Sequence, residues 1–344
     1  MDSIGIDVGK SQSQVAILSE TGEITERRIT TDAVHFTSLL GERARARIVL
    51  EASTESDWVA RCLEGLGHEV IVADPNYAPM YGMRQRRIKT DRRDALALAE
   101  ACRNGVYRPV HRVSPSQHLV RAQLTTREAL VRTRSRCISV VRSLLRHEGL
   151  RVRSGNVETF ALRVRALEVP RPLLQVLTPV LASLAALNRQ IDAAEQRLEA
   201  LTRPDPRVRL LCSLPGIGPI TAAAFMAALD TAGRFEGAHQ VQAYLGLVPR
   251  EYSSGERRQR GRLTKSGNGR TRWLLVEAAW RILRLRRPET HTLWSWADAI
   301  AVRRGRKTAV VALARRLAGI LYAMLRNGVP FDPRRFAVRT RAAV

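Results

Sequence analysis

The sequence predicts an α/β domain followed by a longer, mainly helical region. Three observations support this prediction. Short apolar segments bounded by turn residues alternate with helical spacing over residues 3–100. Apolar residues then recur every three or four positions through residues 115–202. Helical patterns interrupted by glycine-rich turns continue from Val208 to about Arg335.

The first region has the pattern of an antiparallel meander followed by a βαβ unit. Five segments have strand character, namely residues 3–9, 13–18, 23–30, 46–53 and 68–75. Residues 55–67, between the last two strands, have helical spacing and a closing glycine. The stretch TDRRDALALAEACRNG predicts a further helix with a capping Thr or Asp that ends near Gly105.

The helical region contains a heptad seam with alternating spacings of four and three residues. Its members are Leu173, Leu177, Val180, Leu184, Leu187, Ile191, Ala194, Leu198 and Leu201. Pro179 interrupts the seam, so a continuous helix is expected to begin there. A similar stripe precedes it, with Val120, Leu124, Val131, Ile138, Val141 and Leu145. Two interpretations remain open, an intramolecular helical hairpin and an oligomerising coiled coil.

The stretch TRPDPR at 202–207 has the composition of a linker. We therefore expect four parts: an α/β domain at 1–108, a helical or coiled-coil segment at 109–203, a mainly helical domain at 204–336 and a basic tail at 337–344.

The charge of the chain predicts a polyanionic partner. The net charge is +25 and the sequence pI is about 11.4. Residues 103–153 carry twelve Arg against two Glu, and residues 251–287 carry eleven Lys or Arg against three Glu. Nucleic acid is the expected partner of such a surface.

Four acidic residues form the first candidate site. Asp7 and Glu51 each end an apolar strand, and Asp91 and Asp94 share one face at the start of a predicted helix. Each acid taken alone could be a turn or capping residue. Together they form a set of hard oxygen ligands suited to Mg²⁺ and to phosphodiester cleavage. This arrangement resembles that of the RNase H/RuvC-like nucleases.

Two further motifs point to phosphate binding. LPGIGPITAAAF predicts a helix-hairpin-helix, in which the amides near Gly216 and Gly218 can bind phosphate without reading sequence. The stretch YSSGERRQRGR at 252–262 is expected to be a basic loop within a larger basic platform. Candidate phosphate contacts in and around it are Arg250, Arg257, Arg258, Lys265 and Arg272. A serine beside these arginines could attack phosphorus.

The ordered motifs resemble one family. GIDVGK, LEAS, KTDRRDALALAE, LPGIGPITA, AYLGLVPREYSSG and LTKSGNGRTRWLL occur in the order found in the transposases of insertion-sequence family 110. These enzymes are related to the Piv-type DNA invertases and are also called bridge-RNA-guided recombinases.

The resemblance implies a RuvC-like domain, a coiled-coil segment and a transposase domain. It carries the DEDD tetrad onto Asp7, Glu51, Asp91 and Asp94, with Mg²⁺ as cofactor. It carries the nucleophile onto Ser254, directly before Gly255, with Ser253 as the alternative. It further implies a covalent phosphoserine intermediate, donor and target double-stranded DNA, a noncoding bridge RNA, and a dimeric to tetrameric assembly.

Two other functions fit parts of this pattern. A RuvC-like junction nuclease, or a DNA invertase acting without RNA, would use the same acids. A non-catalytic nucleic-acid-binding protein would need only the basic residues.

Other features concern the setting of the protein. The N-terminus has no signal-peptide pattern, the four cysteines are widely spaced, and no apolar run approaches a membrane span. We therefore expect a cytoplasmic bacterial protein, associated with the nucleoid when acting and not with a membrane. Three of the four lysines, Lys10, Lys89 and Lys265, lie in the quoted motifs, so replacing Lys10 or Lys89 by Arg is expected to lower strand cleavage.

Overall fold

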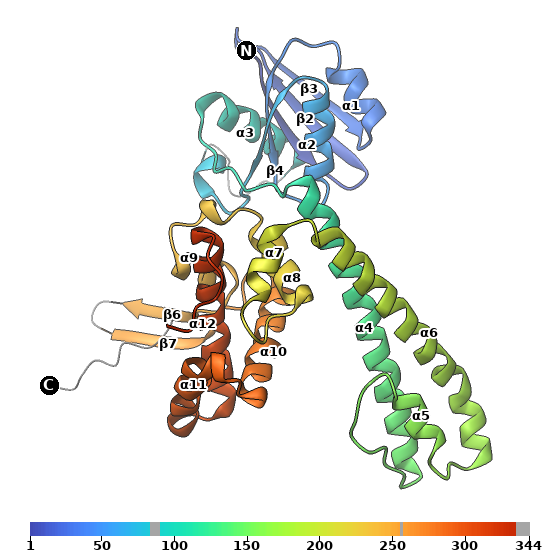
Figure 1. Cartoon of the computed structure of the whole chain (residues 1–344). Coiled ribbons are helices and arrows are strands. Elements are labelled where there is room, and N and C mark those ends of the chain that lie inside the picture. Colours follow the sequence, from blue (N-terminus) through green and yellow to red (C-terminus); the bar gives the residue numbers. More distant parts are fainter. Residues whose placement is uncertain (83–89, 255–256, 335–344) are drawn as a thin grey trace, which may run out of the picture. The chain divides into compact units, whose positions relative to one another are not determined.

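The structure, a computed structural model, describes residues 1–82, 90–254 and 257–334, with the backbone alone for residues 252–254 and 257–260. The chain divides into two compact units, Met1–Arg112 and Val113–Val344 (Figure 1). The protein is thus of mixed α/β class, with a sheet in the N-terminal unit and mainly helices in the C-terminal unit.

The N-terminal unit contains a five-stranded mixed sheet in the order β3-β2-β1-β4-β5. Its strands are β1 (Ser3–Val8), β2 (Gln12–Leu18), β3 (Ile24–Thr30), β4 (Arg47–Glu51) and β5 (Glu69–Ala73). The first three strands form an antiparallel meander, and β4 runs parallel to both β1 and β5. The predicted meander and βαβ unit are therefore confirmed.

Helices cover both faces of this sheet. Helices α1 (Ala33–Leu40) and α2 (Ser56–Gly65) pack on one face, where Ile4 and Ile6 meet Phe36, Leu40 and Leu63. Helix α3 (Asp91–Asn104) packs on the other face through small residues. Alternate side chains of each strand supply the two cores, as the period of a strand requires. The short 3₁₀ helix η1 (Ala78–Tyr81) lies between β5 and α3 in the chain.

The C-terminal unit begins with a long helical hairpin. Its helices are α4 (Pro115–His147), the short α5 (Phe160–Arg165) and α6 (Arg171–Thr202). The seam of α6 is buried against α4 within the same chain, where Leu177 and Leu184 meet Ile138, Val141 and Leu145. This arrangement is the hairpin of the two interpretations left open by the sequence.

One expectation for this hairpin is wrong. Helix α6 begins at Arg171 and continues through Pro179, instead of beginning at the proline. A proline removes one N–H from the helical ladder and disturbs one carbonyl. The long stretches on either side of it, which pack on α4 through Leu177 and Leu181, keep the helix continuous.

The rest of the C-terminal unit is a helical bundle with a two-stranded hairpin. Its elements are α7 (Pro206–Cys212), α8 (Pro219–Leu229), η2 (Ala232–Arg234), α9 (Ala238–Tyr244), β6 (Pro249–Ser254), β7 (Arg257–Leu263), α10 (Gly269–Leu285), η3 (Pro288–Thr290), α11 (His291–Arg304) and α12 (Arg306–Asn327). Helix α8 is buried along nearly its whole length, and α12 packs beside α9, α10 and α11.

The stretch expected to be a basic loop is instead part of an antiparallel β-hairpin. Strands β6 and β7 pair from Pro249 and Leu263 to Ser254 and Arg257. The sequence concealed this hairpin because its strands lack the alternation of apolar and polar residues that marks a half-buried strand. Backbone pairing between the two strands defines it.

One helix of this bundle is strongly apolar. Among the described residues, α12 is long and apolar enough to cross a membrane by length and composition alone. Arg315 and Arg316 interrupt its apolar run, while Leu313, Leu317 and Leu321 are fully buried. The helix is apolar because it fills the core of the bundle.

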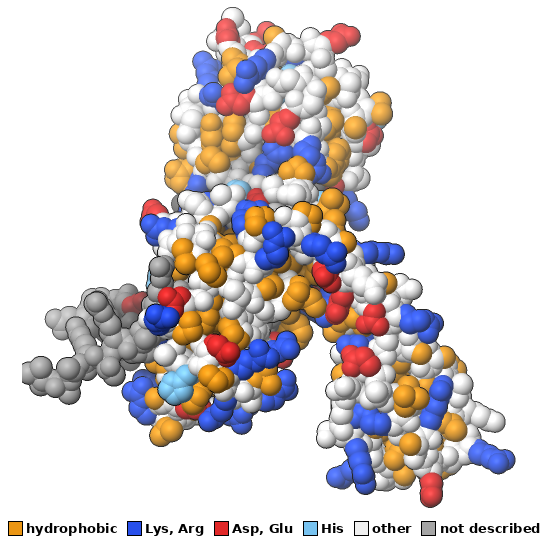
Figure 2. Space-filling view, viewed as in Figure 1, with side chains coloured by type: hydrophobic (Ala, Val, Ile, Leu, Met, Phe, Trp, Pro, Cys, Tyr) orange, Lys and Arg blue, Asp and Glu red, His pale blue; other side chains and the backbone are white. Residues whose placement is uncertain are grey.

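Basic side chains are exposed on this bundle. Figure 2 shows Lys and Arg side chains grouped on its lower part. The exposed cations of α10, α11 and α12 include Arg281, Arg284, Arg303, Arg304, Arg306, Lys307 and Arg326, and the exposed Arg286 and Arg287 directly follow α10.

Candidate active site

The ends of two neighbouring strands bring the first two acids to one edge of the sheet. Strands β1 and β4 are parallel, and their register pairs Ile6 with Leu50. Asp7 directly follows Ile6, and Glu51 directly follows Leu50. Both side chains are half-buried. The two carboxylates therefore belong to the same carboxyl-terminal edge of the sheet.

Helix α3 lies close against β1 because Gly5 has no side chain. A Cβ atom at Gly5 would lie 2.1 Å from the carbonyl oxygen of Ala95 and 2.2 Å from the amide nitrogen of Ala99. The Sγ of Cys102, further along the helix, donates to the carbonyl oxygen of Arg47 at 3.3 Å, at the start of β4. The helix therefore runs antiparallel to β1, and its first turn points toward the edge where β1 ends.

Simple lengths show that this first turn reaches the strand ends. From Cys102 back to Asp94 the helix rises roughly 12 Å. From Ser3, which pairs with Arg47, to Asp7 the strand advances roughly 13 Å. Asp94 thus lies at about the level of Asp7 along the sheet.

The start of α3 is defined by a cap. The Thr90 side chain accepts a hydrogen bond from the Arg93 amide, and Gly105 in the left-handed conformation ends the helix. Both predicted boundaries are confirmed. Asp91 is exposed, whereas Asp94 is buried, with 6% of its surface accessible. The two acids of the first turn therefore have different surroundings.

Tyr81 is a residue of this edge that the sequence did not reveal. Its hydroxyl donates a hydrogen bond to Oε2 of Glu51. Tyr81 ends η1, thirty residues beyond Glu51 in the chain. No spacing rule links residues so far apart, so only the folded chain identifies this partner.

The four acids have the side chains that bind divalent metals, but they do not form a ligand group in the described part of the structure. Carboxylate oxygens are the donors that Mg²⁺ prefers. Among residues 1–82, 90–254 and 257–334, however, no three His, Cys, Asp or Glu side chains form a group that could hold a metal ion. This edge of the sheet therefore supplies carboxylate donors, but their spacing is not that of a complete metal site. Lys10 is exposed in the turn after β1, and Lys89 lies outside the described residues.

The predicted nucleophile belongs to the hairpin of the C-terminal unit. Ser254 ends β6, and its backbone pairs with that of Arg257, while Ser253 pairs with Arg258. The side chains of these four residues lie outside the described part of the structure, as does Gly255. Arg250, by contrast, is described and exposed on β6.

Close backbone contacts secure the base of this hairpin. A Cβ at Gly246 would lie 2.2 Å from the Ser266 carbonyl oxygen, and one at Gly267 would lie 2.0 Å from the Tyr244 carbonyl oxygen. Both glycines have positive φ angles, of 67° and 74°. The segments YLGLV and LTKSGNG are therefore pressed against each other on either side of the hairpin.

Arg272 bonds both of these segments. Its Nη1 atom donates to the carbonyl oxygens of Leu245 at 2.9 Å and Ser266 at 3.0 Å. The sequence nominated Arg272 as a phosphate contact, but its guanidinium here bridges backbone groups. Lys265, also nominated, is exposed in the same turn with a φ of 54°.

The helix-hairpin-helix pattern forms as predicted. Helix α7 is followed by the Gly216–Gly218 turn and then by α8. Gly216 has a φ of 104°, and a Cβ there would lie 2.6 Å from Cγ1 of Ile282. Gly218 precedes the first turn of α8 and has open space around it. The turn can therefore present backbone amides to a ligand.

The basic residues of 103–153 divide into two groups. Arg112, Arg127 and Arg134 form ion pairs with acids of the fold, and Arg121 donates to the Ala227 carbonyl oxygen at 2.7 Å. The exposed group, in which Arg132 also forms an ion pair with Glu128, comprises Arg103, Arg108, Arg132, Arg136, Arg142, Arg146, Arg151 and Arg153. Part of the charge excess is therefore structural, and part faces solvent.

Comparison with known proteins identifies the class. An IS110-type DEDD transposase model matches residues 4–148, and the model described as "Transposase IS116/IS110/IS902 family" matches residues 208–295. The chain is 31% identical to the "Probable family 20 transposase" of Pseudomonas aeruginosa, over 97% of this chain and 99% of that protein. It is 28% identical to the transposase for insertion sequence element IS1111A of Coxiella burnetii, over 94% of this chain and 89% of that protein.

The protein is thus an insertion-sequence transposase, an enzyme that acts on DNA. It belongs to the IS110/IS116/IS902 family of transposases.

Proposed function

We propose that this transposase is a DNA recombinase in which Ser254 attacks the phosphodiester with the help of Asp7, Glu51, Asp91 and Asp94. The N-terminal unit would then be an RNase H/RuvC-like domain. Support comes from its strand order, with an antiparallel meander preceding two parallel strands. The observation that supports the proposal is that Asp7 and Glu51 end neighbouring parallel strands and that α3, whose first turn carries Asp91 and Asp94, packs closely on β1.

The acids are the residues that would hold Mg²⁺. Their oxygens suit this hard cation, and Tyr81 orients Glu51 through its hydrogen bond. When bound, Mg²⁺ would supply positive charge against the phosphate oxygens. The burial of Asp94 limits the positions of its carboxylate, whereas the exposed Asp91 can adjust to a ligand.

The serine step exchanges one phosphodiester linkage for another, so phosphorus stays in a diester throughout. Ser254 Oγ forms a new bond to phosphorus while the bond from phosphorus to a deoxyribose oxygen breaks. The serine proton passes to a base, and the released deoxyribose oxygen gains a proton. Attack of a different deoxyribose hydroxyl on the phosphoserine then restores the serine and joins a new strand. No oxidant, reductant or nucleotide is consumed.

The proposed partners are donor and target double-stranded DNA, a noncoding bridge RNA and further copies of this chain. The net charge of +25 and the exposed arginines of α4 and α10 to α12 support binding of polyanions. The Gly216–Gly218 turn and Arg250 are proposed phosphate contacts, and so are Arg257, Arg258 and Lys265.

The test is a search for a covalent adduct on a denaturing gel. Purified protein is incubated with Mg²⁺, the RNA of the element and supercoiled DNA that carries the element's end. We expect a protein–DNA adduct that Ser254→Ala abolishes and that Asp94→Asn strongly reduces.

Two serine variants act as controls. Ser253→Ala and Ser266→Ala should both retain the adduct, since Ser266 is exposed nearby and engages Arg272 only through its backbone. Loss of the adduct in Ser253→Ala alone would move the nucleophile to Ser253. Strand cutting without any adduct would favour a RuvC-like nuclease, and undiminished activity without RNA would contradict RNA guidance.

A further inference from the structure

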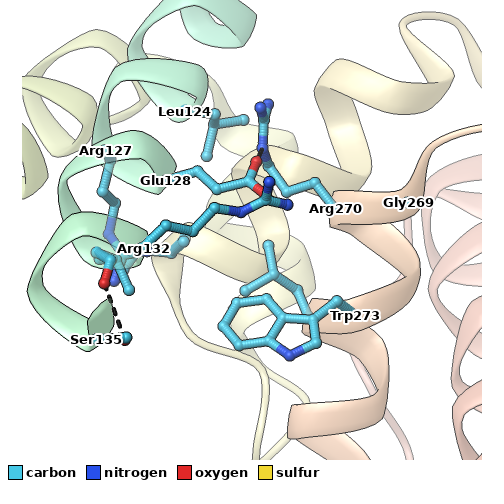
Figure 3. Close-up of a pocket in the computed structure, with 11 residues that line it drawn as sticks. Leu124, Arg127, Glu128, Arg132, Ser135, Gly269, Arg270 and Trp273 are labelled. Atoms are coloured by element: carbon cyan, nitrogen blue, oxygen red, sulfur yellow. Dashed lines mark hydrogen bonds and ion pairs between the residues drawn. The ribbon is translucent and has the colours of Figure 1, made fainter. Parts of the chain in front are cut away.

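A pocket of about 420 Å³ lies in the C-terminal unit where α4 passes α8 and α10 (Figure 3). Its volume is within the range of roughly 300–1,000 Å³ typical of small-ligand sites. Apolar side chains form much of its wall, namely Leu124 and Val131 of α4, Ile220 of α8, and Trp273 and Leu274 of α10. None of these residues belongs to the acidic edge, which is the edge of the sheet where Asp7 and Glu51 end β1 and β4, or to the β6–β7 hairpin.

Trp273 is the most unusual member of this wall. Half of its surface, 50%, is exposed, although the neighbouring Leu274 and Leu275 are buried in the core. The indole therefore contributes little to the core and presents an aromatic face to the pocket (Figure 3). An exposed aromatic side chain beside basic residues is typical of a surface that stacks nucleobases.

A carboxylate inside the pocket supplies a hydrogen-bond acceptor. Glu128 forms ion pairs with Arg132 of its own helix and with Arg270 of α10. Figure 3 shows its carboxylate between the two guanidinium groups, with Trp273 below them. Its carboxylate oxygens can accept a hydrogen bond from an N–H at the edge of a base.

The same wall continues to the helix-hairpin-helix turn. Arg127, Ile220, Trp273 and Leu274 also line a second depression of about 440 Å³. That depression includes Gly216, Gly218, Arg281 and Arg284. Backbone amides and exposed guanidinium groups thus lie on one side of Trp273, and the apolar pocket lies on the other.

We propose that this pocket binds an unpaired base of DNA. Trp273 stacks on the face of the base, Glu128 accepts a hydrogen bond from its edge, and the adjoining phosphate lies over Gly218 and Arg281. Strand exchange by a transposase must unpair bases, so such a base is available during the reaction. The proposal does not depend on Ser254 or on the acids, and its test measures binding alone.

The test compares oligonucleotides that differ in their bases. Four probes are titrated against the full-length protein: an oligothymidine of about 12 nucleotides, an oligouridine RNA and an abasic deoxyribose-phosphate chain of equal length, and a duplex. We expect Trp273→Ala to weaken oligothymidine binding about tenfold, the usual effect of losing one base stack. Binding of the abasic chain and of the duplex should not change. Tryptophan emission should be quenched by oligothymidine but not by the abasic chain.

Two variants guard against an effect on folding. Trp273→Phe keeps an aromatic face and should retain most of the affinity. Leu285→Ala is the matched control, because Leu285 lies on the same helix with a similar exposure of 46%.

Three results would overturn the proposal. The first is equal oligothymidine binding by wild type and Trp273→Ala. The second is an equal loss with the abasic chain, which would assign Trp273 to the fold or to phosphate. The third is a loss seen with oligouridine RNA but not with oligothymidine, which would assign the pocket to RNA.

Discussion

The acidic edge and the β6–β7 hairpin are secured in opposite ways. Asp7 and Glu51 extend from strands whose preceding residues, Ile6 and Leu50, are fully buried. Ser254 ends a strand that pairs with one partner only and lies in a two-stranded sheet. The acids are therefore positioned by a hydrophobic core, and the hairpin is positioned by backbone contacts at its base.

This difference predicts different weaknesses. The positions of Asp7 and Glu51 should change only when a substitution alters the packing of the buried strands or of α3. An isolated two-stranded hairpin is marginally stable without other support. Its geometry should then depend on the contacts of Gly246, Gly267 and Arg272 at its base.

The largest expected effect comes from Gly5. Gly5→Ala places a Cβ atom 2.1 Å from the Ala95 carbonyl oxygen, so α3 must move away from β1. We expect a loss of about 3 kcal/mol in the unfolding free energy of the N-terminal unit. Adduct formation should be lost with it. Chemical denaturation followed by circular dichroism measures the first effect.

Gly65→Ala is the control for this substitution. A Cβ at Gly65 meets no atom within 4 Å, so its stability should stay within about 1 kcal/mol of wild type. Similar losses in both variants would show that contact between α3 and β1 is not the cause.

The next effect concerns the hairpin. Arg272→Ala removes the donors to the Leu245 and Ser266 carbonyl oxygens. The folded β6–β7 hairpin should become less stable, relative to its locally unfolded state, by about 2 kcal/mol. We expect faster amide hydrogen exchange across residues 249–263 and less adduct, with helices α8 and α12 unchanged. Arg262→Ala, an exposed residue of β7, should weaken DNA binding without faster exchange. Unchanged exchange in Arg272→Ala would refute the bridging role.

A smaller effect is expected at Glu51. Tyr81→Phe removes the hydroxyl that donates to Glu51 and should cost about 1 kcal/mol of stability. Strand cleavage should fall roughly tenfold and require more Mg²⁺, as when the hydrogen-bond partner of a metal ligand is lost. A Mg²⁺ titration of cleavage separates this effect from misfolding. Tyr107→Phe should match wild type, and an unchanged Mg²⁺ requirement in Tyr81→Phe would remove Tyr81 from the site.

The smallest effect is a pH dependence at a helix cap of the N-terminal unit. The backbone N–H of His35 donates to Asp32 and lowers the pKa of that carboxyl below its ordinary value of 3.8. Since the folded pKa is the lower one, the stabilisation is present above pH 3.8 and is lost as the pH falls through the folded value. Exchange of the first amides of α1 should therefore accelerate in acid. Asp32→Asn keeps a capping oxygen and should show no such dependence; an identical acceleration there would exclude the carboxyl as the cause.

Much of the N-terminal unit could be predicted from its sequence. The alternation of apolar strands with one helix gave the meander and the βαβ unit, and Thr90 and Gly105 gave the limits of α3. Asp7 and Glu51 could be placed at strand ends because each directly follows a buried apolar run. These features depend on residues near one another in the chain, whose side-chain period is visible in the sequence.

The C-terminal unit was less predictable for a physical reason. The β6–β7 hairpin has no apolar period, and the proline in α6 is tolerated because of packing on α4. The carbonyl partners of Arg272 lie 27 and 6 residues away in the chain, so neither falls in the local pattern of the helix that carries Arg272.

The sequence by itself determined the class of fold and the basic character, and it nominated Asp7, Glu51, Asp91 and Asp94 as candidate site residues. Only the tertiary structure joined Tyr81 to Glu51, used Arg272 as a bridge between two turns and set Trp273 beside Glu128 in a pocket. Local patterns reflect the burial of one face of each element. Contacts between distant segments depend on how those faces pack, and no short stretch of sequence contains that information.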